Sequence, residues 1–318
     1  MIDLSSRAEH DVVVAAKTEA ADGVVVLDLA AAHGAALPAW SPGAHIDLVL
    51  PTGEERQYSL CGPLGADAWR VAVLREERGR GGSAYIHDEL GAGTPLRARG
   101  PLNHFEFRPA EPALFIAGGI GITPLVPMIE AAEASGTPWR LVYAGRERGS
   151  MAFAEELEAK HPQKVELWAS GEGRRLDLGE LLGVPVPGMA VYCCGPARLT
   201  DAVEAAMHAW PHGSLHVERF VPKAVEGAAD VEFEVEFALS GATLTVPPGR
   251  SVLDVAEDAG VLVLSSCREG TCGTCETAIL AGAADHRDSI LSEDEQASNR
   301  TMMICVSRSR GEKLVLEL

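Results

Sequence analysis

The sequence predicts a multidomain chain of the α/β plus β class: a small antiparallel β-barrel, then a parallel α/β domain, then a second β-rich domain. Three observations lead to this prediction. Residues 11–104 consist of short β-prone runs separated by proline and glycine turns. From about residue 111, continuous apolar strands alternate with helical segments. After residue 230, a strand of alternating apolar and acidic residues leads into four cysteines. A chain of 318 residues is long enough for two or three such domains.

Composition and charge exclude several classes of protein. No apolar run approaches the length needed to span a membrane, and residues 1–6 lack the basic and apolar regions of a signal peptide, which favours the cytoplasm. The net charge of −19 argues against binding to nucleic acid. Residues 231–318 carry 15 acidic and 7 basic side chains. This acidic surface either solubilises the protein or steers a basic protein partner.

The all-β part contains a candidate phosphate site. Its β-rich runs are 11–14, 23–29, 45–50 and 69–74. Arg56 could bind a phosphate through two N–H groups of its guanidinium. The turn 79–83 leads into a helical stretch at 84–90, and its backbone N–H groups could donate to the same anion. Tyr58 could lie flat against a ring system. Packing and turn formation explain each feature equally well alone, but together with the cysteine motif they favour a flavin phosphate site.

The α/β part begins with a strand, a glycine turn and a helix. The apolar strand 113–117 is followed by the turn 118–124 and by an apolar helix at 125–134. This arrangement permits a pyrophosphate to approach backbone amides, as in dinucleotide sites. The turn differs from the G-x-G-x-x-G pattern, so the motif alone is weak.

Further β/α units follow this motif and predict an open parallel sheet with its ligand at the carboxyl ends of the strands. The expected strands are 139–144, 164–169 and 189–194, and the expected helices are 151–160 and 199–210. Arg146 follows the first of these strands. It is placed to meet a ribose or phosphate, although a solvated arginine is an equally simple interpretation.

The last part follows a linker and begins with two strands and a helix. Residues 221–230 are rich in alanine, with one proline and one glycine, and are the best linker candidate. Residues 231–237 and 243–246 are expected to pair as strands. Ser251 is expected to cap a helix at 251–259.

Four cysteines then define a metal site. Their spacing, C-x4-C-x2-C-x29-C, is the plant-type [2Fe–2S] pattern, and the ligands are Cys267, Cys272, Cys275 and Cys305. Gly270 and Gly273 permit the loop to wrap closely around a cluster. A structural zinc site or inert thiols are less favoured, because only one C-x2-C pair exists and its partner is remote.

The remaining cysteines are Cys61, Cys193 and Cys194. An odd number with two adjacent does not form a disulfide framework, so a reducing compartment fits. The cluster also predicts a third cofactor. Nicotinamide gives up two electrons as a hydride and a [2Fe–2S] cluster accepts one, so a flavin must stand between them.

The motifs, in their order along the chain, resemble the phthalate dioxygenase reductase and vanillate demethylase reductase family. They are Arg56-x-Tyr58-Ser59, Gly118-Gly119-x-Gly121-x-Thr123-Pro124, Cys194-Gly195-Pro196, His216-x-Glu218-x-Phe220 and the four cysteines, and the segments 285–288 and 303–306 are similar as well. The resemblance implies an FMN-binding barrel at 1–108, an NAD-binding domain at 109–222, a linker at 223–230 and a β-grasp ferredoxin-like domain at 231–318.

The resemblance also implies site residues. Those for the flavin are Arg56, Gln57, Tyr58, Ser59, Ala72, Val73, Gly81, Gly82 and Ser83. Those for NADH are Gly118, Gly119, Ile120, Gly121, Thr123, Pro124, Arg146, Cys194, Gly195 and Pro196. Phe220 is a further candidate cofactor contact, and the candidate catalytic residues are Thr123, Cys194 and Glu218. The chain has Leu74 and Arg75 where family members often carry a basic residue after a barrel strand.

The resemblance implies an NADH-dependent reductase that passes electrons through FMN and the cluster to a terminal Rieske-type oxygenase or demethylase acting on an aromatic compound. Potentials of about −400 mV for plant-type clusters and about −150 to +300 mV for Rieske centres make this transfer downhill. A reductase for a cytochrome P450 and a passive ferredoxin-type carrier are the alternatives. The choice of FMN over FAD rests on the family, and the basic residues in the turn 145–148 could tolerate the 2′-phosphate of NADPH.

Overall fold

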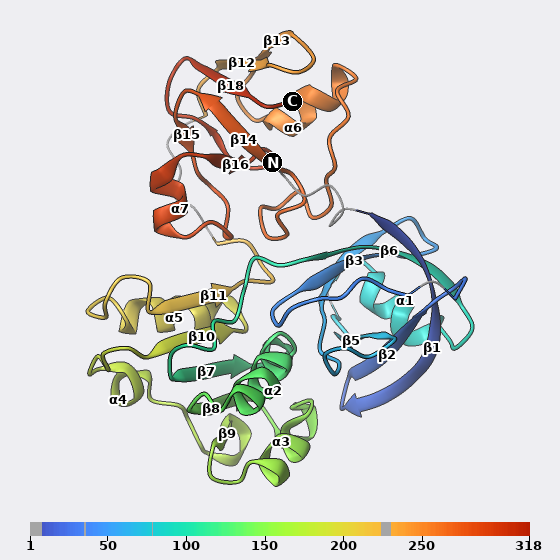
Figure 1. The fold of residues 1–318 in the computed structure, drawn as a ribbon, viewed down its shortest axis with the longest axis vertical. Helices are drawn as coiled ribbons and strands as arrows, with labels where there is room; N and C mark the ends of the chain where they lie inside the picture. The colour runs from blue at the N-terminus through green and yellow to red at the C-terminus, as the bar shows by residue number, and fades with distance from the viewer. Residues whose placement is uncertain (1–7, 35, 78, 224–229) are drawn as a thin grey trace. The chain divides into compact units, whose positions relative to one another are not determined.

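The computed structural model describes residues 8–34, 36–77, 79–223 and 230–318. The chain divides into two compact units, residues 1–218 and 219–318 (Figure 1). The first unit contains both the antiparallel sheet and the parallel sheet. Of the predicted linker at 223–230, residues 224–229 lie outside the described residues.

The antiparallel sheet of the first unit closes into a barrel. Its six strands lie in the order β4-β3-β6-β1-β2-β5, and the two end strands meet where Leu60 pairs with Val71. The strands are β1 (Glu9–Ala21), β2 (Val24–Ala31), β3 (His45–Val49), β4 (Glu55–Ser59), β5 (Trp69–Leu74) and β6 (Pro95–Leu102). Alternate side chains, such as Val12 and Val14 in β1, fill the core.

A short helix, α1 (Gly82–Asp88), packs against the barrel through Ile86, which is fully buried in the same core. Lys17 of β1 donates hydrogen bonds from Nζ to the carbonyls of Ile86, His87 and Leu90, at 2.8, 2.6 and 2.9 Å. A cation suits this position because the last carbonyls of a helix carry partial negative charge. The barrel therefore fixes one face and the C-terminal end of α1, and with them the turn that precedes it.

The second sheet of this unit is entirely parallel, in the order β11-β10-β7-β8-β9. Its strands are β7 (Ala113–Gly118), β8 (Trp139–Gly145), β9 (Val165–Ala169), β10 (Ala190–Cys194) and β11 (Leu215–Glu218). Helices α2 (Leu125–Ser135) and α3 (Ala154–Lys160) cover one face, and α4 (Leu178–Leu182) and α5 (Ala197–Ala206) cover the other. In β7, Phe115 faces the first pair of helices and Ile116 the second, which explains the continuous apolar run.

Two helices differ from the sequence prediction. Helix α3 begins at Ala154 rather than residue 151, because Phe153 has φ 62° and interrupts the helical backbone. Helix α5 spans Ala197–Ala206 rather than residues 199–210. Beyond it the chain turns, and Trp210 donates a hydrogen bond from its indole Nε1 to the carbonyl of Leu182, at 2.7 Å. Side-chain contacts of this kind are not visible in the hydrophobic pattern.

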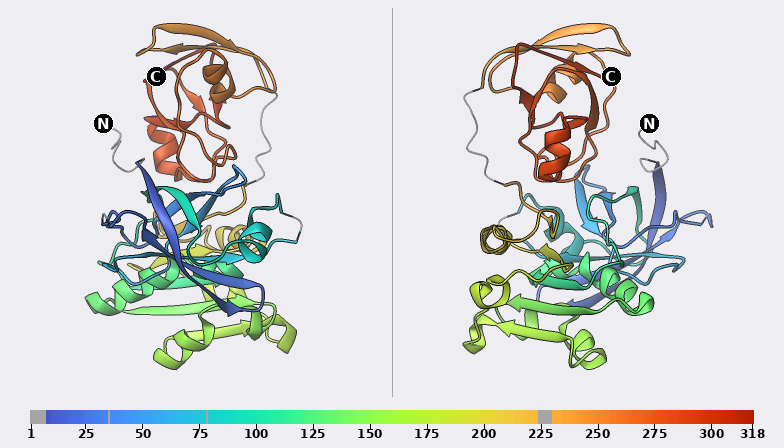
Figure 2. Two further views of the ribbon diagram at one scale, coloured as in Figure 1. Left: turned by 90° about the vertical axis from the view of Figure 1, so that its right-hand side faces the viewer. Right: turned by 60° about the vertical axis from the view of Figure 1, so that its left-hand side comes forward.

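The second unit is built on a mixed five-stranded sheet in the order β13-β12-β18-β14-β16. These strands are β12 (Phe233–Phe237), β13 (Ala242–Val246), β14 (Glu276–Ala281), β16 (Thr301–Met303) and β18 (Lys313–Leu316) (Figure 2). Strands β12 and β18 run parallel, and the other neighbours run antiparallel. Helix α6 (Val252–Asp258) packs on the sheet, and Ser251 and Asp254 form a capping box at its start.

The unit is completed by the two-stranded sheet β15 (Ala284–Asp285) with β17 (Arg308–Ser309) and by helix α7 (Glu293–Ser298). The predicted fold class is therefore confirmed: an antiparallel barrel, a parallel α/β sheet and a C-terminal mixed sheet. Among the described residues, no helix combines the length and apolar character that crossing a membrane requires.

Candidate functional site

Three side chains from the two sheets of the first unit meet at one place. Ser59 ends β4 of the barrel, Cys194 ends β10 and Glu218 ends β11. Ser59 Oγ lies 3.4 Å from Glu218 Oε2, and Cys194 Sγ lies 3.8 Å from the same oxygen. Both predicted catalytic residues, Cys194 and Glu218, are thus adjacent to the predicted flavin residue Ser59. The carboxyl edge of the parallel sheet faces the barrel at this point.

The three side chains are uncharged at neutral pH. Burial raises the pKa of the Glu218 carboxyl to about 8, although the hydrogen bonds from Ser59 and Cys194 partly lower it. Burial also raises the pKa of the Cys194 thiol well above its usual range, and the neighbouring Glu218 raises it further. Glu218 is half-buried, and among the described residues its side chain accepts these two long hydrogen bonds. Because little stabilises its anion, the protonated acid is favoured.

The glycine turn after β7 packs directly against the end of β10. A Cβ at Gly121 would lie 2.5 Å from the carbonyl carbon of Cys194 and 2.6 Å from the nitrogen of Gly195. A Cβ at Gly195 would in turn lie 2.9 Å from Cα of Gly118. Only glycines allow the two backbones to approach this closely. The turns after two neighbouring parallel strands therefore form one continuous backbone surface.

Two hydroxyl groups stabilise the rest of this turn. It contains a 3-10 helix, η2 (Gly119–Ile122), in which Gly119 has φ 53°. Tyr143 of β8, fully buried, donates its hydroxyl to the carbonyl of Gly119 at 3.0 Å. Thr123 is 2% exposed and donates its hydroxyl to the carbonyl of Ile120 at 3.0 Å, so it stabilises the turn. Pro124 precedes α2 directly. The support from Tyr143 was not predicted from the sequence.

Arg56 lies beside the turn that opens α1, as predicted for a phosphate site. A Cβ at Gly82 would lie 2.9 Å from Arg56 Nε, so the guanidinium passes directly over this glycine. Arg56 also pairs with Glu54, at 2.8 Å between its terminal nitrogen and Glu54 Oε1. Gly81 has φ 98°, a backbone conformation that favours glycine, and lies beside the Glu54 carboxylate. Ser83 Oγ accepts the N–H of Glu76 at 3.0 Å. The contact of Arg56 with Glu54 was not predicted from the sequence.

The other predicted flavin residues lie on different faces of their strands. Gln57 donates from Nε2 to Asp47 Oδ1 at 2.8 Å, and Asp47 is fully buried. Tyr58 packs against the barrel core, and burial raises the pKa of its hydroxyl. Val73 is fully buried in the barrel core, whereas Ala72 belongs to a small apolar cluster that also contains Ala152 of the α/β part.

The loops after β8 and β10 hold the remaining predicted nucleotide residues. Arg146 is exposed, and its carbonyl accepts the N–H of Gly171 at 2.7 Å. Arg148 is engaged by two carboxylates, at 2.9 Å from Glu158 Oε2 and 3.7 Å from Glu172 Oε2. Pro196 is exposed. Phe220 is 41% exposed and belongs to the second unit.

In the second unit, the four predicted cluster ligands form one contiguous group. The side chain of Cys267 contacts those of Cys272 and Cys305, and Cys275 contacts Cys305. Each is buried, at 2–8% exposed. Hydrogen bonds from Cys272 and Cys305 and from the backbone N–H groups of residues 269 and 271 lower the pKa of Cys267. The two N–H groups lie 3.3 and 3.4 Å from its sulfur.

This loop has the backbone expected of a cluster-binding segment. Arg268, Gly270 and Gly273 all have positive φ, at 58°, 72° and 77°. Within the described ranges, no three His, Cys, Asp or Glu side chains surround a single point as one metal ion requires. A [2Fe–2S] cluster instead divides four thiolates between two irons. Backbone N–H groups aimed at a cysteine sulfur fit such a cluster, because they stabilise its negative charge.

Two family models match the parts of the chain that contain the glycine turns and the cysteine loop. Residues 115–205 match the family model of oxidoreductase NAD-binding domains, and residues 236–310 match that of 2Fe-2S iron-sulfur cluster binding domains. Phenoxybenzoate dioxygenase subunit beta of Ectopseudomonas oleovorans is 44% identical over 301 residues, which cover 94% of each chain.

Solved structures also resemble the whole chain. An intact type IV self-sufficient cytochrome P450 monooxygenase is 40% identical with a TM-score of 0.92; the match covers 98% of this chain but only 41% of that one. Phthalate dioxygenase reductase, described as a modular structure for electron transfer from pyridine nucleotides to [2Fe-2S], is 34% identical with a TM-score of 0.70, over 98% of each chain. The chain belongs to the phthalate dioxygenase reductase family and is an NAD(P)H-dependent oxidoreductase with a flavin and a 2Fe-2S cluster.

Proposed function

We propose that the chain is the reductase component of a multicomponent oxygenase and passes electrons from NADH through FMN and a [2Fe–2S] cluster to a terminal Rieske-type aromatic oxygenase or demethylase. The observation that carries this proposal is the meeting of Ser59, Cys194 and Glu218. This contact brings Ser59, predicted to bind the flavin, next to Cys194, predicted to lie near the nicotinamide ring. The cysteine loop of the second unit then supplies the one-electron centre.

The flavin would bind at the barrel strand β4. Arg56 and the N–H groups near Gly82 would hold its phosphate, and Ser59 would lie at the ring end of the site. When bound, a flavin accepts two electrons from a hydride and releases them one at a time. A single guanidinium would suit the single phosphate of FMN. FMN over FAD follows the family resemblance.

The nicotinamide nucleotide would bind at the carboxyl edge of the parallel sheet. The surface formed by the turns at Gly121 and Gly195 would hold the pyrophosphate, because turns at the carboxyl ends of two neighbouring parallel strands can present backbone amides to an anion. Cys194 and Glu218 would lie beside the reacting ring. Because both pKa values are raised, neither side chain would place a charge beside the reacting ring.

The loop after β8 favours NADH over NADPH. A 2′-phosphate requires a cation that is not already neutralised. Arg148 pairs with Glu158 and also lies near Glu172, so its charge is compensated. Only Arg146 remains as an exposed cation directly after the strand. With Arg146 as the single uncompensated arginine of this turn we expect a preference for NADH, and Arg146→Ala should increase the ratio of kcat/KM for NADH to that for NADPH.

An anaerobic NADH titration of the purified protein tests the proposed electron path. The visible spectrum is followed during the titration, and the flavin is then released and identified. We expect the flavin and iron–sulfur bands to bleach together and the released flavin to be FMN. A spectrum that neither NADH nor NADPH changes would overturn the nucleotide assignment and leave a passive ferredoxin-type carrier.

A cytochrome P450 is the second candidate for the terminal acceptor. The observation in its favour is the similarity to the self-sufficient P450 monooxygenase, which covers 98% of this chain. The internal chemistry would be identical, so only the acceptor distinguishes the two. Reconstitution of the reductase with a Rieske-type oxygenase and, separately, with a P450 compares them through the coupling of NADH consumption to product formation.

A further inference from the structure

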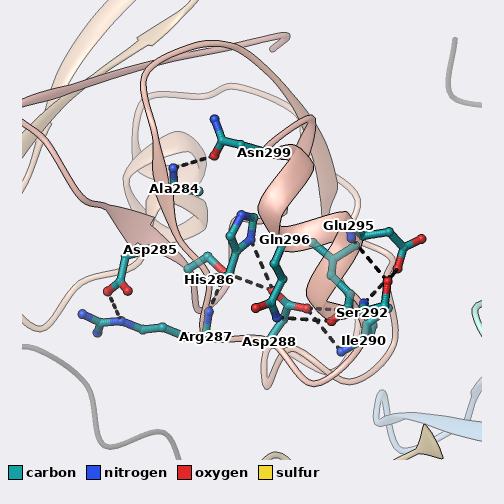
Figure 3. A network of polar contacts seen from close by, with 12 residues as sticks. Ala284, Asp285, His286, Arg287, Asp288, Ile290, Ser292, Glu295, Gln296 and Asn299 are labelled. Carbon is teal, nitrogen blue, oxygen red and sulfur yellow. Dashed lines mark hydrogen bonds and ion pairs between the residues drawn. The ribbon is translucent and has the colours of Figure 1, made fainter. Parts of the chain in front are cut away.

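A buried carboxylate lies next to the cysteine loop of the second unit and has no role in the function proposed above. Asp288 is 6% exposed and stands at the centre of a polar network (Figure 3). Its Oδ2 accepts the backbone N–H groups of Ile290 and Leu291, at 3.2 and 2.8 Å. Its Oδ1 lies 3.4 Å from Ser307 Oγ and 3.8 Å from Nδ1 of His286, whose side chain is 2% exposed.

Asp288 is in backbone contact with the loop that carries the first three cysteines. A Cβ at Gly270 would lie 3.1 Å from Cα of Asp288 and 3.3 Å from its Cβ. The next residue, Ser289, donates its N–H to the carbonyl of Gly270 at 2.9 Å. Gly270 lies between Cys267 and Cys272. Any movement of Asp288 would therefore be passed to the loop between these two cysteines.

The same carboxylate is connected to the segment of the fourth cysteine. Ser307 lies two residues after Cys305 and is fully buried. Its hydroxyl donates to Asp288 Oδ1 at 3.4 Å and accepts the N–H of Arg287 at 3.1 Å. The backbone N–H of Ser307 donates to the carbonyl of Met303 at 2.9 Å. Asp288 thus joins the two segments that together carry all four cysteines.

The surroundings of Asp288 keep it ionised. Burial raises the pKa of the Asp288 carboxyl, but the His286 ring and the N–H groups of residues 290 and 291 lower it, and the net pKa lies below the ordinary value. A buried carboxylate with several donors holds its charge because the donors replace the lost water. A fixed negative charge therefore lies beside the cysteine loop.

We propose that Asp288 is a positioning residue for the [2Fe–2S] cluster, one that holds both cysteine segments in register and lowers the reduction potential of the cluster through its charge. This inference rests on the cluster assignment in the proposed function. Reduction adds one negative charge to the cluster, so a nearby fixed anion disfavours the reduced form. The consequence for function is a stronger one-electron donor.

The test is an EPR-monitored redox titration of the full chain with Asp288→Asn. Asparagine keeps the shape and one oxygen acceptor but removes the charge. A unit charge at about 10 Å and an effective dielectric constant of about 20 changes a one-electron equilibrium on the order of tenfold. We therefore expect the midpoint potential of the cluster to rise by about 59 mV, the value that corresponds to tenfold for one electron.

Asp294→Asn is the matched control, because it removes the same charge from an exposed position in α7. Its midpoint potential should stay at the wild-type value. Ser307→Ala separates positioning from charge: it deletes the hydroxyl that joins the two segments, so the EPR spectrum of the reduced cluster should change while the carboxylate remains.

An unchanged potential in cluster-loaded Asp288→Asn, or an equal rise in Asp294→Asn, overturns the role of the charge. If Asp288→Asn does not retain a cluster, Ser307→Ala decides, and an unchanged EPR spectrum in that variant overturns the role in positioning. Absence of a cluster from the wild-type protein would instead refute the cluster assignment itself. The EPR spectrum of the wild-type protein tests this separately.

Discussion

Replacement of Glu218 by glutamine should make the first unit more stable, by an amount that grows with pH. The pKa of this carboxyl is raised to about 8 in the folded protein, from an ordinary value of 4.5. Between these two pH values the folded state binds a proton that the unfolded state releases. Stability of the wild type therefore falls as the pH rises through this window, and is unaffected by this group below it.

The magnitude follows from the size of the pKa shift. Each pH unit within the window changes the free energy of unfolding by about 1.4 kcal/mol, which gives roughly 5 kcal/mol over the whole shift as an upper limit. Water that reaches the partly exposed Glu218 reduces this value. Glutamine does not ionise. The difference between Glu218→Gln and the wild type should therefore increase from about pH 5 to about pH 8 and then level off.

Tryptophan fluorescence gives an assay that is specific for this unit. All five tryptophans of the chain lie before residue 219, so urea unfolding followed by fluorescence reports only the unit that contains Glu218. The two proteins are compared at each pH, which cancels the titration of all other groups. A difference that is independent of pH, or one that decreases with rising pH, would show that Glu218 does not carry a raised pKa.

Three further predictions concern the cofactor sites. Cys272→Ser should abolish NADH-dependent cytochrome c reduction and spare reduction of the flavin by NADH, since only the cluster is lost; loss of both, in a protein that still melts cooperatively, contradicts the proposed order of electron transfer. Glu54→Ala should tighten FMN binding about fivefold, because the partly buried ion pair that competes for Arg56 is worth about 1 kcal/mol; fluorescence titration of the apoprotein should show the gain for FMN and not for riboflavin, which lacks the phosphate. Gly121→Ala should slow flavin reduction by NADH on the order of 100-fold, because its Cβ would collide with the backbone of Cys194 and displace the nucleotide surface; stopped-flow rates that match the wild type would show that this turn does not position the nucleotide.

The parts of the site that depend on short spacing were predictable from the sequence. The strand, glycine turn and helix around Gly121 appear as one contiguous pattern, and the structure has a strand, a turn and a helix in these places. The first three cysteines are likewise close in the chain, and their spacing alone predicts contact. In such segments the local sequence restricts the backbone enough to place the side chains.

Contacts between distant segments could not be predicted in the same way. Ser59 and Glu218 are 159 residues apart, and their contact depends on how the barrel packs against the parallel sheet. Gln57 belongs to the same motif as Arg56, yet its amide bonds to the buried Asp47 rather than lying with the guanidinium. The side chains of neighbouring residues in a strand point to opposite faces of the sheet. A sequence motif can therefore identify site residues without showing which side chains each of them contacts.

Two buried carboxylates show why charge is harder to predict than position. Burial raises the pKa of both Glu218 and Asp288, but the net shift is upward for Glu218 and downward for Asp288. Glu218 accepts two long hydrogen bonds, at 3.4 and 3.8 Å, from side chains that ionise poorly. Asp288 accepts two backbone N–H groups and lies near Ser307 and His286. The number and quality of donors, supplied by the fold, thus decide whether a buried acid is neutral or charged. In the proposed function, a neutral acid at Glu218 would lie beside the reacting nicotinamide without adding a charge there. A charged acid suits the surroundings of a one-electron centre, because it shifts the potential without taking part in the transfer.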